Sequence, residues 1–186
     1  YRPLIIRGNR TLGSMLLDKK LVTPEQLDAA NEMLLENLEK DDVRRASLLH
    51  VLLFELQVLN EDAFLEATVE KCGLALMDLH GCQFRKFADL HLDPSASWAT
   101  WTVPFDIVED YVMLATLMYP SPPVVKFWQE KYAGKNIIWY ATSVRSFQSA
   151  LEKFDQHPAA ADRAVVPAAG KPPPRGHSKP PLAVKK

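Results

Sequence analysis

The sequence predicts an α+β protein in three parts, and three observations support this. Over the first eighty residues, apolar positions recur at the three- and four-residue steps of helices. From about Trp98 onward they alternate or form short continuous runs, as in strands. The segment 157–186 holds seven of the fourteen prolines. We therefore expect a helical subdomain at 1–80, a small α+β subdomain with a roughly three-stranded sheet at 81–156, and a disordered, Pro-rich tail at 157–186.

Two helix start signals organise the first part. Thr23 precedes Pro24, so a capping hydroxyl stands directly before a proline suited to the first helical position. Asn60 precedes two acidic residues in the same way, and Gly73 supplies a natural end for the helix after that cap. The apolar face expected behind Thr23 comprises Leu27, Ala30, Leu34 and Leu38.

The two halves of this region superimpose at an offset of about 37 residues, which predicts an internal repeat of a helix, a tight turn and a capped second helix. One helical hairpin cannot bury its apolar face alone, whereas two copies packed together can. The matched pairs are Leu12 with Leu49, Leu16 with Leu53, Leu17 with Phe54, Val22 with Leu59, Thr23 with Asn60, Leu27 with Phe64, and Ala30 with Ala67.

The α+β part is predicted from three apolar segments. Trp101, Val103 and Phe105 alternate with more polar residues, which indicates a half-buried strand. The runs 112–118 and 136–142 indicate two further strands. We expect helices at 122–132 and 143–154, and a polar connection around 81–94 that joins this part to the repeats.

Charge and composition argue against nucleic-acid binding and against a transmembrane segment. The tail 157–186 carries six lysine or arginine residues against one acid, a net charge of +5, so residues 1–156 carry −6. A folded part of that sign is a poor nucleic-acid binder, because phosphate contact needs a basic face. No apolar run is long enough for a transmembrane segment. With only two cysteines, the composition fits a reducing compartment, and we expect a cytoplasmic protein.

Motifs for catalysis, metal ions and cofactors are missing from the sequence. Gly8 and Gly13 have the spacing of a phosphate-binding loop, but Ser14 and Met15 come next where lysine and serine or threonine are needed. The spacing of the histidines and cysteines around residues 72–91 matches no established metal site. Asp78, an acid between apolar residues, fits a turn or capping role. We predict a protein without catalytic residues, metal ion or cofactor, which is not an enzyme.

The repeat and the region after it, over about 8–156, resemble the N-terminal, MshEN-like domain of type II secretion and type IV pilus assembly ATPases. The segments that carry the resemblance are 12–17, 21–27, 58–67 and 72–79. The resemblance implies a non-enzymatic docking or adaptor domain that binds a protein component of a secretion, pilus or motility machine, at the periphery of the inner membrane. No ATPase sequence comes after it, so the chain is either a fragment or a stand-alone copy, and the low-complexity tail favours the second.

On this interpretation the partner-binding surface consists of apolar residues that we expect to be exposed. The same surface is a candidate for self-association. The tail is either a solubilising linker or a docking peptide for an aromatic groove or an anionic surface. The candidate partner-binding residues are Leu34, Leu48, Trp98 and Trp101.

The alternative function is a cyclic di-GMP sensor, because some members of this family bind that nucleotide through both repeats. Their motif has Arg-Leu-Gly early in each repeat, then a further glycine and a final glutamine. Here the first repeat has Thr11 at the arginine position, with Arg10 one residue early, and then Lys20 and Leu34. The second repeat has Leu48, His50, Gln57 and Lys71 at the corresponding positions.

Both motif arginines and both glutamines are therefore replaced. Each hydrogen bond to a charged group contributes about 1.5–3 kcal/mol, so losing two weakens binding by roughly 10²–10⁴-fold. The sequence thus favours protein docking over nucleotide binding. The residues that the alternative assigns to ligand binding are Arg10, Leu12, Gly13, Leu16, Leu17, Leu49 and Leu53.

Overall fold

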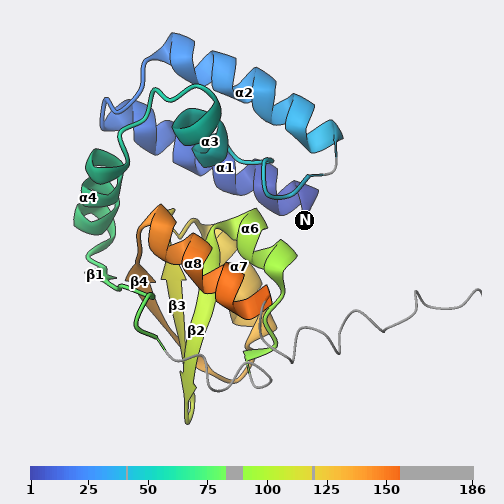
Figure 1. Cartoon of the computed structure of the whole chain (residues 1–186), viewed down its shortest axis with the longest axis vertical. Coiled ribbons are helices and arrows are strands. Elements are labelled where there is room, and N and C mark those ends of the chain that lie inside the picture. The colour runs from blue at the N-terminus through green and yellow to red at the C-terminus, as the bar shows by residue number, and fades with distance from the viewer. Residues whose placement is uncertain (41, 83–89, 119, 156–186) are drawn as a thin grey trace, which may run out of the picture.

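The computed structural model describes residues 1–40, 42–82, 90–118 and 120–155. Its helices and four-stranded sheet confirm the α+β class, with the helical repeats at one end and the sheet at the other (Figure 1). The predicted tail at 157–186 lies outside the described residues, as does 83–89 of the predicted polar connection.

The first repeat consists of helices α1 (Arg2–Asp18) and α2 (Pro24–Glu39). Thr23 forms the expected cap: its side chain accepts the Gln26 backbone N–H, and the Gln26 side chain accepts the Thr23 N–H. These reciprocal bonds satisfy two backbone donors that the first turn leaves free. The start of α2 is therefore determined by residues 23–26 alone.

The second repeat has a shorter leading segment. Helix α3 (Leu48–His50) continues directly into η1 (Val51–Glu55), a π-helical turn in which the Leu56 N–H bonds the Val51 carbonyl at 2.8 Å. Helix α4 (Glu61–Cys72) begins at the predicted cap, Asn60, which accepts the Ala63 N–H. It ends at Gly73, whose φ of 61° is the left-handed conformation that glycine adopts at low cost.

The turns between the paired helices share a positive φ at one equivalent position. Lys20 has φ 55° and Gln57 has φ 54°, and these positions are related by the 37-residue offset. Most side chains need a compensating constraint to occupy this region, because their Cβ crowds the following carbonyl oxygen. The two copies therefore share this left-handed residue, although the hydrogen bonds of the turns differ: the Leu21 N–H bonds the Leu16 carbonyl, and the Val58 N–H bonds the Leu52 carbonyl.

The sheet has one strand more than predicted. Its order is β1-β4-β3-β2, formed by β1 (Ala75–Leu76), β2 (Thr102–Val108), β3 (Tyr111–Thr116) and β4 (Asn136–Ala141). β2 and β3 are antiparallel, whereas β3 and β1 both run parallel to β4. The additional strand, β1, comes directly after α4, so the end of the second repeat pairs with the sheet. Pro104 is tolerated because β2 is an edge strand, and the register shifts between Pro104 and Asp106.

A short helix that the sequence interpretation missed precedes β2. Helix α6 (Pro94–Thr100) begins at Asp93, whose carboxylate accepts the backbone N–H groups of Ser95 and Ala96. Trp98 therefore lies on a helix, and Trp101 ends that helix with φ 48° rather than beginning the strand. The cap Asp93 followed by Pro94 was a readable start signal, but the alternation after Trp98 pointed to extended structure.

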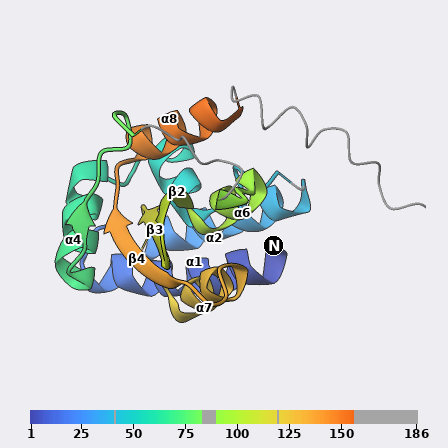
Figure 2. The same cartoon turned by 90° about the horizontal axis from the view of Figure 1, so that it is seen from below.

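Helices α7 (Pro122–Lys131) and α8 (Val144–Asp155) lie on opposite faces of the sheet (Figure 2). Val112 and Leu114 of β3 pack toward Trp128 of α7 in one apolar cluster. The other cluster joins α8, through Phe147, to the helical repeats. One continuous core therefore connects the repeats to the sheet, and the boundary at residue 80 remains a prediction.

Candidate functional site

An open groove lies between α1 and α2, with a volume of about 460 Å³. Three apolar side chains on its borders are exposed to solvent: Ile6 at 44%, Leu17 at 36% and Leu35 at 55%. Arg10, Ser14 and Asn31 contribute its polar atoms. The remaining lining residues are Asn9, Gly13, Leu27, Leu34, Leu38 and Leu48.

Gly13 brings the helices together at the base of this α1–α2 groove. A Cβ atom placed on Gly13 would lie 3.4 Å from both terminal methyls of Leu27 and 3.6 Å from a methyl of Leu48. Those are ordinary contact distances for a methyl group, but anything larger must displace a neighbour or turn into the groove. The glycine thus permits close packing of α1 with α2 and with the start of the second repeat.

Asn9, also at the base of the groove, connects the two repeats by hydrogen bonds. Its side chain is 2% exposed, and its Oδ1 accepts the Leu48 N–H at 2.8 Å and the Ser47 hydroxyl at 3.4 Å. Its Nδ2 donates to the Ile5 carbonyl within α1 at 2.8 Å. The first N–H of α3 therefore has its acceptor on α1, so the two repeats depend on each other.

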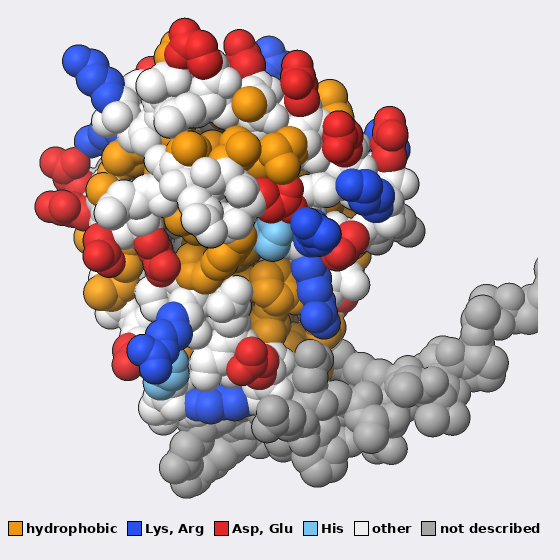
Figure 3. Space-filling view, turned by 45° about the horizontal axis from the view of Figure 1, so that its top comes forward, with side chains coloured by type: hydrophobic (Ala, Val, Ile, Leu, Met, Phe, Trp, Pro, Cys, Tyr) orange, Lys and Arg blue, Asp and Glu red, His pale blue; other side chains and the backbone are white. Residues whose placement is uncertain are grey.

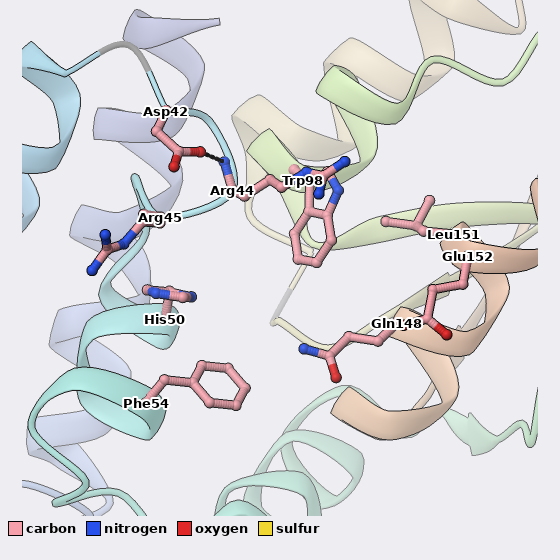
Figure 4. A pocket seen from close by; sticks show the side chains of 9 residues that line it. All are labelled: Asp42, Arg44, Arg45, His50, Phe54, Trp98, Gln148, Leu151 and Glu152. Atoms are coloured by element: carbon pink, nitrogen blue, oxygen red, sulfur yellow. Dashed lines mark hydrogen bonds between the residues drawn. The ribbon is translucent and has the colours of Figure 1, made fainter. Parts of the chain in front are cut away.

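A second hollow, of about 490 Å³, lies between the second repeat and the sheet part. His50 and Phe54 contribute from α3 and η1, Trp98 from α6, and Gln148 with Glu152 from α8 (Figure 4). Phe54 points into this α3–α8 pocket and is 42% exposed. The other lining residues are Asp42, Arg44, Arg45 and Leu151.

Charged side chains on one wall of the α3–α8 pocket are organised around Glu55. Its Oε1 accepts hydrogen bonds from Arg45 at 3.0 and 3.2 Å and from the Asn37 amide at 3.2 Å. His50 Nε2 lies 3.4 Å from the same oxygen. Burial lowers the pKa of His50 below its usual value and outweighs the attraction of Glu55, with Arg45 acting in the same direction as burial.

Trp98 lines the opposite wall, supported from behind by buried aromatic rings. The Trp98 ring lies edge-on to Trp101 and to Phe147, at centroid distances of 5.4 and 5.2 Å. The Arg44 guanidinium lies 5.7 Å from the Trp98 ring centroid, within the range of a cation–π contact. Figure 3 shows apolar side chains gathered in the middle of this face of the molecule, beside a histidine that lies between acidic and basic side chains.

The groove and the pocket occupy equivalent faces of the two repeats. Gly13 and Leu17 line the first, and His50 and Phe54, 37 residues later, line the second. The repeat therefore presents the same outward face twice. The first copy covers that face with α2, leaving an apolar groove, whereas the second turns it toward α6 and α8.

The structure corrects the expected exposure of the partner-binding residues. Leu34 is 5% exposed, Leu48 is 1% exposed and Trp101 is fully buried, so the expectation that these side chains are exposed is wrong. Leu34 and Leu48 form part of the groove's base, and Trp101 stacks on Phe147 at 5.4 Å. Trp98 is half-buried and lines the α3–α8 pocket.

The residues assigned to nucleotide binding divide into two groups. Arg10, Gly13 and Leu17 meet in the α1–α2 groove. The other four do not line it: Leu12, Leu16 and Leu49 are at most 2% exposed in the core, and Leu53 is partly buried. The sequence interpretation missed Ile6 and Leu35, the most exposed groove residues, although both stand one step away from buried apolar positions.

Asp78 has the turn role that its setting suggested. Its Oδ1 accepts the His80 backbone N–H at 3.0 Å and lies 2.7 Å from the His80 ring. These bonds, with the backbone one contributing most, lower the pKa of Asp78. Within 1–40, 42–82, 90–118 and 120–155, no three His, Cys, Asp or Glu side chains are grouped so as to hold a metal ion.

Comparisons with known proteins leave the family of the chain open. No protein-family model matches it, and no curated protein matches it. Solved structures that do match include one of MshE with cdg, at 17% identity and a TM-score of 0.46, covering 78% of this chain and 96% of that chain. A likeness of this size is too weak to define a family or a function. Among the described residues, no helix is both long and apolar enough to cross a membrane.

Proposed function

We propose that the chain is a non-enzymatic protein-interaction domain whose α1–α2 groove binds an amphipathic helix of a partner. By the sequence resemblance, that partner is a cytoplasmic segment of a membrane-platform protein in a secretion, pilus or motility machine. The observation that carries the proposal is the line of exposed apolar side chains along the groove, Ile6, Leu17 and Leu35, above an apolar base. Exposed apolar surface with a polar rim is typical of a protein contact.

The shape and polarity of the groove favour a helix as the occupant. It runs between two helices, and a partner helix can set an apolar face into such a groove with side chains at three- and four-residue steps. The polar rim of Arg10, Ser14 and Asn31 then faces the polar flanks of that helix. Burying one leucine-sized side chain contributes about 1.5–3 kcal/mol. Micromolar affinity needs about 8 kcal/mol beyond the cost of association, so anchors from both the groove and the partner helix must be buried.

The test is direct titration of the full chain with the purified cytoplasmic domain of the platform protein from the same organism. Leu35→Asp and Ile6→Asp place a charge on exposed positions, so they leave the core intact. Each should weaken binding by about tenfold or more, because a charge in an apolar contact costs at least about 1.4 kcal/mol. Val108→Asp is the matched control, since Val108 is 44% exposed near the far end of β2.

Binding that is equal for the unaltered chain, Leu35→Asp and Ile6→Asp would remove the groove from the interface. Weakening by Val108→Asp alone would place the contact on the sheet instead. Loss of binding in all three variants, accompanied by altered circular dichroism, would indicate misfolding, and Leu35→Ala then replaces Leu35→Asp.

A cyclic di-GMP sensor is the second candidate, supported by the approach of Arg10 to Gly13 and Leu17 in the groove. The guanidinium is the one charged group lining the groove within the described residues, and it could bond a guanine edge or a phosphate. Calorimetry with cyclic di-GMP tests this function. Arg10→Ala should lose about 10- to 100-fold in affinity, whereas Arg7→Ala, on the same helix but outside the groove, should lose little. No heat at high micromolar ligand would reject it.

A further inference from the structure

We propose that the chain's own Lys171-Pro172-Pro173-Pro174-Arg175 segment binds in the α3–α8 pocket. This occupant is distinct from the partner of the proposed function, which takes the α1–α2 groove. The proposal rests on the aromatic side chains of the pocket, on its charges, and on the position from which the tail leaves the described structure.

The aromatic side chains suit a proline-rich ligand. Phe54 projects from η1 and is 42% exposed, while the half-buried Trp98 stands on the other side of the hollow (Figure 4). Between them, the pocket of about 490 Å³ has room for two or three residues of an extended chain. Proline-rich segments bind to aromatic-lined grooves because the polyproline conformation is preformed and loses little entropy.

The charges of the pocket provide a contact for a basic residue beside the prolines. Glu152 stands exposed on the α8 side of the pocket and can receive the flanking Lys171 or Arg175. The pocket also has two cations: Arg45 is bonded to Glu55 at 3.0 Å, and Arg44 lies over the Trp98 ring. Asp42 adds a carboxylate on their side of the pocket. Over longer distances, residues 1–156 carry −6 against +5 on 157–186, which attracts the tail to the folded part.

The tail begins close to the pocket. Leu151 and Glu152 line the pocket from α8, and α8 ends at Asp155, three residues or about 4.5 Å of helix rise further on. The sixteen residues from Asp155 to Lys171 span at most about 55 Å when extended, far more than the return path requires. A tether of this length gives an effective concentration of about 1 mM, so even a weak contact is populated.

The experiment compares the full chain with the same chain carrying Pro172→Ala, Pro173→Ala and Pro174→Ala, by two-dimensional NMR of the tryptophan indole N–H groups. Loss of one signal in Trp98→Phe assigns the Trp98 indole. The triple substitution should shift the Trp98 signal and the side-chain amide signal of Gln148. The Trp128 signal should stay in place, because that indole is buried and donates to Thr100 at 3.2 Å.

Phe54→Ala provides the matched variant. Removing this exposed ring should abolish the effect, so that the triple substitution causes no further Trp98 shift in the Phe54→Ala chain. Leu35→Asp, in the other hollow, should leave the full effect in place, which separates failure of this proposal from failure of the groove. A synthetic peptide of residues 168–178 should bind the triple variant about tenfold more tightly than the unaltered chain, since the tethered segment competes.

Two results would overturn the proposal. The first is an unchanged Trp98 signal after the triple substitution, together with equal peptide affinity for both chains. The second is a Trp98 difference that disappears on dilution from about 500 to 20 µM, because a segment bound within one chain is insensitive to concentration. That outcome would make a second copy of the chain the occupant.

Discussion

The first and second helical repeats share a positive φ in the turn and a side-chain cap on the second helix, but they present different outer faces. Lys20 and Gln57 share a positive φ, and Thr23 and Asn60 both cap the second helix of their copy. At the outer face, Gly13 is replaced by His50. The first copy forms an apolar groove there, and the second forms a pocket with aromatic and charged walls.

This difference shows which parts of the repeat the fold requires. Caps and turns determine where each helix begins and ends, so they persist in both copies. The outward positions are constrained only by what packs on them, and they have diverged with their surroundings. The leading segment has diverged as well, from the seventeen-residue α1 to the three residues of α3 followed by a π-helical turn.

The largest expected effect comes from breaking the bond between the copies. Asn9→Ala removes the acceptor for the buried Leu48 N–H, and an unpaired buried donor costs about 1–3 kcal/mol. We expect urea unfolding to show a loss of about 2 kcal/mol. Asn31→Ala, on the exposed rim of the groove, should change the free energy of unfolding by less than about 0.5 kcal/mol. Equal effects of the two substitutions would mean that the cross-repeat bond adds nothing.

The next largest loss of stability is expected when the first copy receives the outer-face residue of the second. Gly13→His places in the first copy the side chain found at the equivalent position of the second. The imidazole must displace Leu27 or Leu48, or extend into the groove, and we expect a loss of about 1–2 kcal/mol in urea unfolding. Ser14→His, on the adjacent exposed position, is the control and should be nearly neutral. A neutral Gly13→His would contradict the close packing described for α1.

The shared turn predicts a smaller, stabilising effect. Lys20→Gly and Gln57→Gly should each raise the free energy of unfolding by about 0.5–1 kcal/mol, because glycine adopts positive φ without strain and this outweighs its greater entropy when unfolded. Lys40→Gly, at φ −79°, should destabilise the chain instead. A higher free energy of unfolding for only one of the two glycine variants would show that the two turns are not energetically equivalent.

The smallest expected effect is a pH dependence of stability that arises from His50, a residue found only in the second copy. Because burial lowers the pKa of His50, the folded chain binds fewer protons than the unfolded chain. Stability therefore falls as pH drops through the unfolded histidine pKa of about 6.5. Urea unfolding at pH 8 and 5.5 should show a smaller loss for His50→Gln than for the unaltered chain. The same pH dependence in both would contradict a lowered pKa for the partly buried His50.

Much of the fold is predictable because it depends on local chemistry. The caps at Thr23 and Asn60 and the end at Gly73 depend on neighbours a few residues away, so the helices they bound could be read from sequence. The two-residue strand β1 could not, since two residues carry no periodicity and its pairing partner, β4, lies some 65 residues further along the chain.

The candidate site was harder to predict than the fold. Leu34 belongs to the same apolar stripe that predicted its helix, so its burial is a consequence of the periodicity, and the exposed leucine is its neighbour Leu35. The α3–α8 pocket depends on tertiary structure, because Phe54 and Trp98 are distant in sequence and line the same hollow only in the folded chain. No short sequence pattern could predict that these two side chains line one pocket.

The strand β1 is one route by which a mechanical load would pass through the molecule. It joins the end of the second repeat to β4, and the Met77 N–H extends the pairing to the Ala141 carbonyl at 2.8 Å. Further along, the Leu79 N–H donates to the Ser146 hydroxyl at 2.6 Å. A pull on α4 would load this row of bonds directly, whereas a pull on α1 from the groove is carried first by the packing of α1 on α6 and α7. A force on the second repeat therefore acts on β4 and on α8, the helix from which the tail departs.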